Sequence, residues 1–263
     1  MDNVRVTHIG GPTALVEAGA WRILTDPTFD PPGRRYSFGW GTGSRKTAGP
    51  ALDPKELGPV DVVLLSHDQH ADNLDDRGRE LLASVPTVIT TAKAARRLTK
   101  AGTAQDVRGL RPWEQTVLEA PGRPPITVTA TPARHGPPLS EPIVGPVVGF
   151  ALAWDGQEHG VLWMTGDTVL CPALRELPRR LTVDTVLLHL GGVRFPISGP
   201  LRYTMTAEKA VELCALVNPR TIIPVHYEGW EHFREGRAAV ERAFAGAPGG
   251  LGERLHWLPL RVP

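Results

Sequence analysis

The sequence predicts a mixed fold of the α+β or α/β class, on three observations. Short strand-like segments open the chain, strand-like and helix-like segments then alternate, and several apolar strands end in histidine or aspartate. The 28 glycines and 26 prolines favour many turns between short elements over long bundled helices. Since no internal repeat, low-complexity run or linker interrupts the 263 residues, we expect one domain spanning residues 1–263.

The first part of the chain reads as a β-meander, a long loop and a buried strand. Residues 4–9, 13–17 and 21–25 have strand character and are separated by glycine-containing turns. Residues 29–59 are rich in glycine, proline, arginine and aromatic side chains without a sustained period, which indicates either a floppy excursion or a loop that lines a substrate pocket. Residues 60–65 contain the apolar run VVLL and predict a fully buried strand.

Strands and helices alternate through the rest of the chain. Residues 206–217 form a clear helix, because Thr206 is a good N-cap and Asn218-Pro219 is a stop signal. Residues 147–154 and 160–164 are expected to pair as a hairpin. The remaining expected helices are 75–83, 92–99 and 236–244, and the remaining expected strands are 87–90, 116–119, 126–130, 184–188, 221–225 and 255–258.

Composition argues against several classes of function. The formal net charge of +1 gives no basic surface for nucleic acid or an anionic membrane, so no nucleic-acid partner is expected. No window approaches about 18 continuous apolar residues and the first residues lack an apolar signal core, which predicts no transmembrane segment and a cytoplasmic location. Cys171 and Cys214 lie far apart, so we expect two buried thiols and neither a disulfide nor a thiolate metal cage.

The stretch at residues 66–75, SHDQHADNLD, directly follows the apolar run. It gathers two histidines, three aspartates and an asparagine. An apolar strand that stops abruptly in ligand-type side chains is typical of a metal centre, because the strand end is rigid and the turn beyond it is open to solvent. Three later strands end in the same way, at His135, Asp167 and His226. Since a sheet brings strand ends to one edge, these residues are expected to meet.

Imidazoles and carboxylates without thiolates suit zinc, manganese or iron in a catalytic site better than they suit a structural zinc site. Any one of these residues alone would more often be structural. His189, which comes shortly before a Gly-Gly pair, and Tyr203 are candidates for contact with a substrate, with a structural role as the alternative for each.

The order of these motifs resembles the metallo-β-lactamase superfamily. A β-meander, an apolar strand ending in SH-D-x-H-x-D, a strand ending in histidine, a TGDT turn and a final PxH strand follow one another over nearly the whole chain. Within the superfamily the chain is most similar to the branch of ascorbate-phosphate lactonase and N-acylethanolamine phospholipase D. The resemblance implies a four-layer αββα sandwich with the metal site at one edge of the two sheets.

The resemblance also implies a ligand set. His70 and His135 correspond to ligands of a first metal position, Asp72 and His226 to ligands of a second, and Asp167 to the carboxylate that bridges both. One or two divalent metal ions are therefore expected, zinc before manganese or iron.

The opening stretch departs from the family's HxHxDH motif by one residue. Read from the strand side, His67 is the first histidine of the motif; read from the helix side, Asp68 takes its place. We interpret Gln69 as an inserted residue whose local bulge lets His67 point inward, with Asp68 as the alternative ligand. Asn73 stands where the family has histidine. Because an amide oxygen is a poorer zinc ligand than imidazole, Asn73 predicts a weakened second position, with either a mononuclear centre or a preference for manganese.

These residues predict a metal-dependent hydrolase. A metal ion held by them would lower the pKa of water from about 15.7 to about 7, and the resulting hydroxide would attack an ester, lactone or phosphodiester of a small molecule. Asp72 is placed to hold the water and take its proton, and His226 either completes the second position or stabilises the leaving group. The alternatives are a metal-binding or ligand-sensing protein that has lost hydrolysis and, less favoured, a nuclease; a homo-oligomer is compatible with the sequence.

The substrate is expected to contact segment 29–59, whose side chains favour two different chemistries. Its aromatic residues indicate an apolar substrate, whereas its basic residues could grip a phosphate. The aromatic set is Tyr36, Phe38 and Trp40, and the basic set is Arg34, Arg35, Arg45 and Lys46.

Overall fold

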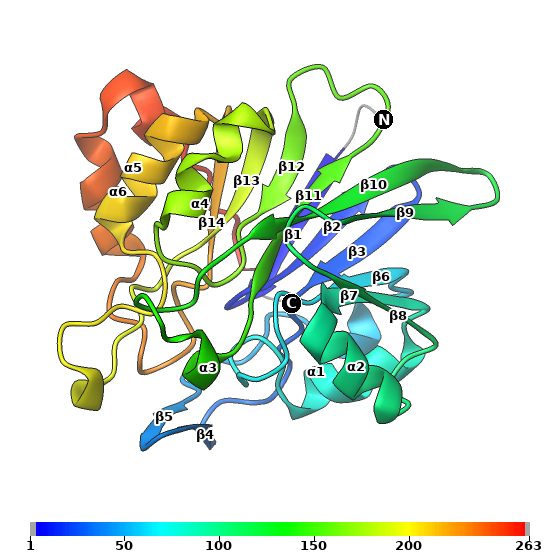
Figure 1. Cartoon of the computed structure of the whole chain (residues 1–263), viewed down its shortest axis with the longest axis horizontal. Coiled ribbons are helices and arrows are strands. Elements are labelled where there is room, and N and C mark those ends of the chain that lie inside the picture. The colour runs from blue at the N-terminus through cyan, green and yellow to red at the C-terminus, as the bar shows by residue number, and fades with distance from the viewer. Residues whose placement is uncertain (1–3, 261–263) are drawn as a thin grey trace.

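The computed structural model describes residues 4–260 as two six-stranded sheets packed face to face, with helices on the outer faces (Figure 1). The strand orders are β1-β2-β3-β6-β7-β8 and β14-β13-β12-β11-β10-β9. This is the four-layer αββα sandwich that the motif order implied, so the predicted fold class is confirmed.

The first sheet joins the N-terminal meander to a parallel half. The strands β1, β2 and β3 are antiparallel, and β3 then pairs in parallel with β6, β6 with β7, and β7 with β8. Helices α1 (Asp76–Leu81) and α2 (Ala92–Lys100) cover its outer face. The strands are β1 (Val4–Gly10), β2 (Thr13–Ala18), β3 (Trp21–Thr25), β6 (Val62–Leu64), β7 (Thr87–Thr91) and β8 (Asp106–Leu110).

The second sheet has the same two-part design. The strands β9 to β12 are antiparallel neighbours, whereas β12, β13 and β14 are parallel. Helices α4 (Pro172–Arg175), α5 (Ala207–Val217) and α6 (Arg237–Ala245) cover its outer face, and the short helix α3 (Glu141–Val144) lies in the loop after β10. The strands are β9 (Gln115–Ala120), β10 (Arg123–Pro132), β11 (Val148–Ala153), β12 (Val161–Met164), β13 (Val183–His189) and β14 (Thr221–Val225).

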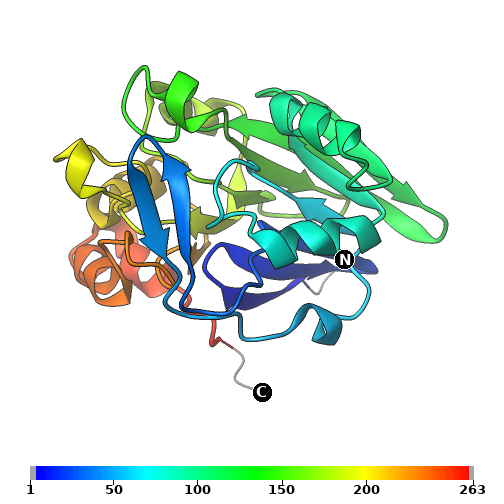
Figure 2. The ribbon, with the colours of Figure 1, turned by 90° about the horizontal axis from the view of Figure 1, so that it is seen from below.

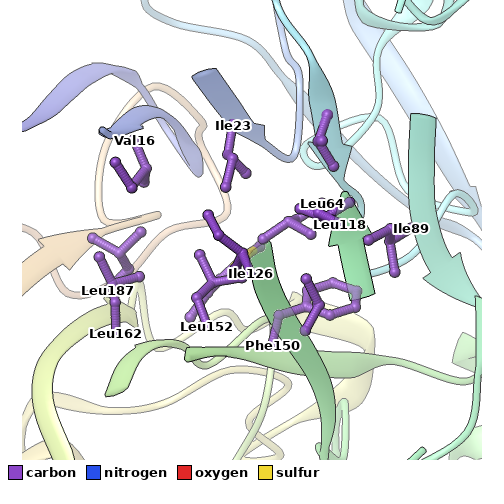
Figure 3. Close-up of a cluster of buried hydrophobic side chains, with 14 of the residues drawn as sticks. Val16, Ile23, Leu64, Ile89, Leu118, Ile126, Phe150, Leu152, Leu162 and Leu187 are labelled. Atoms are coloured by element: carbon purple, nitrogen blue, oxygen red, sulfur yellow. The ribbon is translucent and has the colours of Figure 1, made fainter. Parts of the chain in front are cut away.

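The central core lies between the two sheets. Figure 3 shows Ile23, Leu64 and Ile89 of the first sheet facing Leu152 and Leu187 of the second, and all are buried. The run VVLL is buried throughout because successive side chains along a strand point to opposite faces of the sheet, and both faces are covered here. Val62 and Leu64 join this central cluster, while Val63 and Leu65 pack in the cluster beneath α1 and α2. A strand buried on both faces needs the unbroken apolar run that predicted it.

The structure decides between the two alternatives for residues 29–59. This segment is not a structureless excursion: β4 (Arg35–Gly39) and β5 (Thr42–Arg45) form an antiparallel hairpin, seen as two blue strands in Figure 2. A 3₁₀ turn at Pro54–Glu56 follows. The hairpin escaped prediction because its strands are short, polar and glycine-rich, and they pair with each other outside either main sheet.

Two further differences concern strands at sheet edges. The strand β8 was not predicted, because its sequence DVRGL is polar for most of its length and borders the sheet on one side only. The strand expected at residues 255–258 is absent from the described structure, where Leu255 makes a single bridge to Ile222. Both cysteines are buried and free, as predicted. Among the described helices, none combines the length and apolar character needed to cross a membrane.

Candidate metal centre

Six side chains singled out in the sequence meet at one edge of the sandwich. Three of them come from the turn after β6, and the others follow β10, β12 and β14. They form two groups, and within each group the ligand atoms all lie within 4.8 Å of one another. The groups are His67, His70 and His135, and Asp72, Asp167 and His226; all six are buried.

The first group has the spacing of ligands that share an ion. His70 Nδ1 lies 3.0 Å from His67 Nε2 and 3.1 Å from His135 Nε2. Two donors bound to one tetrahedral zinc at about 2.0–2.1 Å are separated by roughly 3.3 Å. Three imidazole nitrogens converging at such distances are chemically suited to bind a divalent cation.

Hydrogen bonds at the Nδ1 atoms of His67 and His135 orient these rings so that their Nε2 atoms face the other donors. His135 Nδ1 donates to the carbonyl oxygen of Tyr203 at 2.7 Å, which leaves Nε2 with its lone pair. Ser66 Oγ donates its proton to Asp26 Oδ2 at 2.9 Å, so it accepts from His67 Nδ1, also at 2.9 Å. Partners of this kind fix the tautomer and orientation of metal-binding imidazoles.

Burial keeps these imidazoles neutral. It lowers the pKa of His67 well below 6.5 and lowers the pKa values of His70 and His135 to about 4, and the neighbouring imidazoles repel a proton further. At neutral pH each ring therefore presents a lone pair. A cation that needs neutral nitrogen donors would find them already deprotonated.

The metal-free protein should lose stability as the pH falls from about 6.5 to about 4. In this window the unfolded histidines are protonated, whereas His70 and His135 in the folded state are not, so the unfolded state binds more protons. His226 acts in the opposite window: its folded pKa is about 9, so its stabilising charge is present below pH 6.5 and is lost as the pH rises towards 9. These histidines together predict maximal stability near pH 6.5.

Urea unfolding of the chelated protein between pH 4 and 9 measures this effect. His135→Asn should flatten the acid limb, while His256→Ala, at an exposed site, should leave it unchanged. An acid limb that is equally steep in both variants would contradict the assignment.

The second group contains buried polar atoms without partners. His226 Nε2 lies 3.4 Å from Asp167 Oδ2 and 3.5 Å from Asp72 Oδ2, and neither contact satisfies hydrogen-bond geometry. Both oxygens of Asp167 and Oδ1 of Asp72 have no hydrogen-bond partner. Buried carboxylate oxygens are costly without a donor or a cation. The donor set of this group, two carboxylates and an imidazole, thus fits a divalent metal ion.

The electrostatics of the second group agree with this chemistry. Burial opposes charge on His226, but Asp167 and Asp72 outweigh it and raise the pKa of His226 to about 9. Burial also opposes ionisation of Asp72, yet the neighbouring imidazoles of His226 and His232 hold its pKa well below the usual range. The site therefore concentrates negative charge that a proton on His226 partly balances. A metal ion would take over this role from the proton.

A glycine makes the turn that carries Asp167. Gly166 has φ +62°, and a Cβ at this position would lie 2.6 Å from the carbonyl oxygen of Val148. Residues with a side chain are excluded there both by the left-handed backbone and by the close approach. The neighbouring Thr168 accepts a hydrogen bond from the Arg134 backbone at 2.9 Å, which ties this turn to the one that carries His135.

The structure brings His67, and not Asp68, to the other donor atoms. Asp68 is gripped by the guanidinium of Arg97 on α2, with Nε 2.8 Å from Oδ2 and a second bond from Nη2 to Oδ1. Gln69 points away from the centre and donates to the carbonyl oxygens of Val144 and Pro146. The additional residue does not form a β-bulge, because β6 ends at Leu64 and the extra length is taken up in the turn beyond it.

Asn73 does not join either ligand group. Its Nδ2 donates to Asp26 Oδ2 at 3.1 Å, and its Oδ1 has no partner. Asp26 also accepts from the Ser66 backbone at 2.7 Å, and His189 Nε2 lies 3.3 Å from its Oδ2. His189 is thus fully buried in a polar network behind the centre, which is the structural alternative for this residue.

Sequence reasoning missed two residues of this site. Asp26 directly follows the end of β3, as the other candidate ligands follow their strands. The TDP sequence therefore carried a signal from which Asp26 could have been predicted. His232 lies in a loop after β14, and its Nε2 is 2.9 Å from Asp72 Oδ2. Nothing in the local sequence singles out His232 as a candidate ligand, because it does not directly follow a strand.

An apolar pocket of about 310 Å³ opens over the two groups. Side chains at its floor include His70, Asp72 and His135. Phe38 and Trp40 come from the hairpin β4–β5, so segment 29–59 does line a pocket. The other lining residues are Thr42, Ile143, Val144, Val193, Phe195, Ile197, Ser198, Leu201, Tyr203 and His232.

The four basic residues singled out in segment 29–59 have acidic partners. Lys46 Nζ is buried against Asp75 Oδ2 at 2.8 Å. The three arginines pair on the surface, Arg34 with Asp76 and both Arg35 and Arg45 with Glu231. None of these four residues lines the apolar pocket.

Comparison with known proteins identifies the family. A family model described as a β-lactamase superfamily domain matches residues 21–227. The chain is 27% identical over 252 residues to a UPF0173 metal-dependent hydrolase of Opitutus terrae, covering 93% of this chain and 95% of that protein. It is 29% identical over 230 residues to a protein of the same name from Carboxydothermus hydrogenoformans, covering 86% of each. These names agree with the predicted enzyme class.

Solved structures share the fold. A possible metal-dependent hydrolase from Veillonella parvula has a TM-score of 0.79 at 20% identity, covering 97% of this chain and 96% of that one. An isothiocyanate hydrolase from Delia radicum gut bacteria has a TM-score of 0.76 at 18% identity, covering 96% and 95%. The match of the family model to most of the chain, together with this shared fold, confirms the resemblance: the chain belongs to the β-lactamase superfamily of metallo-hydrolases.

Proposed function

We propose that this metallo-hydrolase binds one or two divalent metal ions at the two ligand groups and hydrolyses a small, largely apolar ester or lactone. The observation that carries the proposal is the convergence of unpaired, buried carboxylate oxygens and neutral imidazoles at the floor of an apolar pocket. Zinc is the first expectation from the donor set, with manganese or iron as alternatives.

The metal ion and the surrounding residues would have different roles in hydrolysis. A divalent ion held here supplies Lewis-acid chemistry and makes water acidic enough to ionise near neutral pH. Asp72 reaches both the pocket and the second group, and its Oδ1 has no partner, so it is placed to orient a water molecule by accepting a hydrogen bond. When no second metal ion engages it, Asp72 can also take the proton of this water. His226 does not line the pocket and is fully buried, which favours a metal-binding role for it over contact with a leaving group.

The pocket lining supports a neutral substrate over a phosphodiester. The described residues that line it include four Phe, Trp or Tyr rings from two chain segments and no lysine or arginine. The four are Phe38, Trp40, Phe195 and Tyr203. A phosphodiester would need cationic partners close to the ions, whereas an acyl or lactone chain gains by leaving water for such a surface. The Tyr203 ring is one wall, and its hydroxyl is a candidate contact for a polar group of the substrate.

A panel of esters, lactones, phosphodiesters and isothiocyanates, assayed with the metal-loaded protein, tests the function. We expect turnover of apolar esters or lactones that chelation abolishes and metal restores. A folded, metal-loaded protein without activity on the whole panel would favour the binding or ligand-sensing alternative. A metal-free, inactive protein would refute the hydrolase.

Phe38→Ala should raise the KM for an apolar ester by about 10–100-fold with a smaller change in kcat. Removing a ring that buries a substrate surface costs about 1.5–3 kcal/mol of binding. Arg35→Ala on the same strand is the matched control, because its side chain is 64% exposed and does not line the pocket. Equal KM values for the two variants would show that the substrate does not contact this wall.

The register of the opening stretch is testable by metal content alone. His67→Ala should lower bound metal, because a donor of the first group is lost. Asp68→Asn should leave metal content unchanged, because that carboxylate faces Arg97. Elemental analysis of the two purified variants distinguishes the alternatives, and loss of metal in Asp68→Asn alone would reverse our assignment.

A further inference from the structure

The second ligand group lacks the donor that the family motif places at position 73. The amide nitrogen of Asn73 donates to Asp26 Oδ2 at 3.1 Å, and its oxygen has no partner. The group then offers one imidazole and two carboxylates. The family resemblance assigns one of these carboxylates, Asp167, to both metal positions. On these residues alone the second metal position would be weak.

His232 brings a nitrogen to this group from a different part of the chain. Its Nε2 lies 2.9 Å from Asp72 Oδ2, the same oxygen that His226 Nε2 approaches at 3.5 Å. Each imidazole nitrogen therefore lies at a distance from this one carboxylate oxygen that is close to the roughly 3.3 Å expected for two donors on one ion. His232 is 3% exposed, so its nitrogen is not simply solvated.

Aromatic packing holds this ring in place. The imidazole of His232 stacks on Phe195 with centroids 5.3 Å apart and planes inclined by 10°, and Phe38 packs at 5.2 Å from another side. The His232 backbone N–H donates to Ser44 Oγ of β5 at 3.3 Å. The ring's Nδ1 has no partner, so the orientation of the ring is set by this packing together with the contact of Nε2 with Asp72.

We propose that His232 is a ligand of the second metal position and replaces the histidine that Asn73 lacks. This inference rests on the proposed metal centre and changes one expectation from the sequence: the second position is complete. Asp72, His226 and His232 hold it together with Asp167, and the three histidines of the first group with Asp167 hold the other. The mixed nitrogen and oxygen donor set suits zinc or manganese.

The alternative role for His232 is a hydrogen-bond donor that only positions Asp72. The two roles differ in metal stoichiometry, because a ligand is needed for the second ion and a positioning residue is not. His232→Phe tests this directly: the phenyl ring keeps the stacking on Phe195 and removes both nitrogens. Asn73→Ala is the matched control, since it removes the family-position side chain.

The full-length protein is stripped with a chelator, reloaded with zinc or manganese and freed of excess metal before elemental analysis. We expect two ions per chain in the unsubstituted protein and in Asn73→Ala, and about one in His232→Phe, with affinity for the second ion at least about 10-fold weaker. Manganese EPR gives an independent reading: a spin-coupled pair should become an isolated ion. Unfolding curves of the chelated proteins show that the variant is folded.

Two ions retained by folded His232→Phe would overturn the ligand role while leaving the proposed hydrolase intact. One ion in the unsubstituted protein would also overturn it, because the second position would then be unfilled. No bound metal in the unsubstituted protein would remove the proposed centre itself, and the inference with it.

Discussion

Asp167→Asn is expected to lower kcat/KM by at least about 10²-fold and to reduce bound metal. Asp167 is fully buried with both oxygens unpaired, and it lies 3.4 Å from His226 at the second group. The substitution keeps the shape of the side chain but removes the negative charge and one of the two oxygens. Even residues that only hydrogen-bond a metal ligand are worth about 10–100-fold, so a direct ligand should matter at least as much.

Elemental analysis and steady-state kinetics on the best substrate of the panel measure this effect. Asp184→Asn is the control, because it makes the same chemical change on β13 at a carboxylate that pairs with Arg220 on the surface. Far-ultraviolet circular dichroism checks that both variants fold. Full metal content and near-normal activity in Asp167→Asn would show that this carboxylate is not part of the centre.

Lys46→Met is expected to destabilise the protein by about 3–5 kcal/mol. Lys46 is 3% exposed, and its ammonium lies 2.8 Å from Asp75 Oδ2. The same carboxylate accepts backbone hydrogen bonds from Phe29, Asp30 and Gly78, so it holds the start of segment 29–59 against α1. Removing the cation leaves a buried carboxylate charge without its counterion, which costs about this amount in proteins.

A double-mutant cycle isolates the charge. Asp75→Asn in the Lys46→Met background removes the uncompensated charge while an amide oxygen remains to accept backbone hydrogen bonds. We therefore expect the double variant to lose less stability than the sum of the single losses. Urea unfolding at pH 7 measures each corner of the cycle. A decrease of less than about 1 kcal/mol in the free energy of unfolding of Lys46→Met would mean that water solvates the Asp75 carboxylate once the lysine is removed.

Local pattern predicted most of the elements that form the two sheets. The run VVLL predicted β6 because a strand buried on both faces has no polar side, and Thr206 predicted the start of α5 because its hydroxyl accepts the Lys209 backbone N–H. Pattern failed for short strands with few apolar residues. The edge strand β8 and the hairpin β4–β5 bury too few apolar side chains to show a period.

The candidate site divides in the same way. The histidines and aspartates at strand ends could be predicted as candidate ligands from the sequence, because rigid strand ends at a common sheet edge often carry metal ligands. Whether His67 or Asp68 faces the other donors could not be predicted from the sequence, since it depends on Arg97, which lies on α2 in another part of the chain. The pairing of Arg34, Arg35, Arg45 and Lys46 with acidic partners could equally not be predicted from the sequence.

By itself, the sequence determined the superfamily, the layered fold and six of the candidate ligands. The superfamily and the layered fold follow from the family that this order of motifs resembles, and the ligands follow from residue type at strand ends; both are carried by the linear sequence. Tertiary structure alone decided which donors face one another. His232 and Asp72 are 160 residues apart in sequence and 2.9 Å apart in space, a contact that exists only because packing on Phe195 and Phe38 sets the ring above the second group.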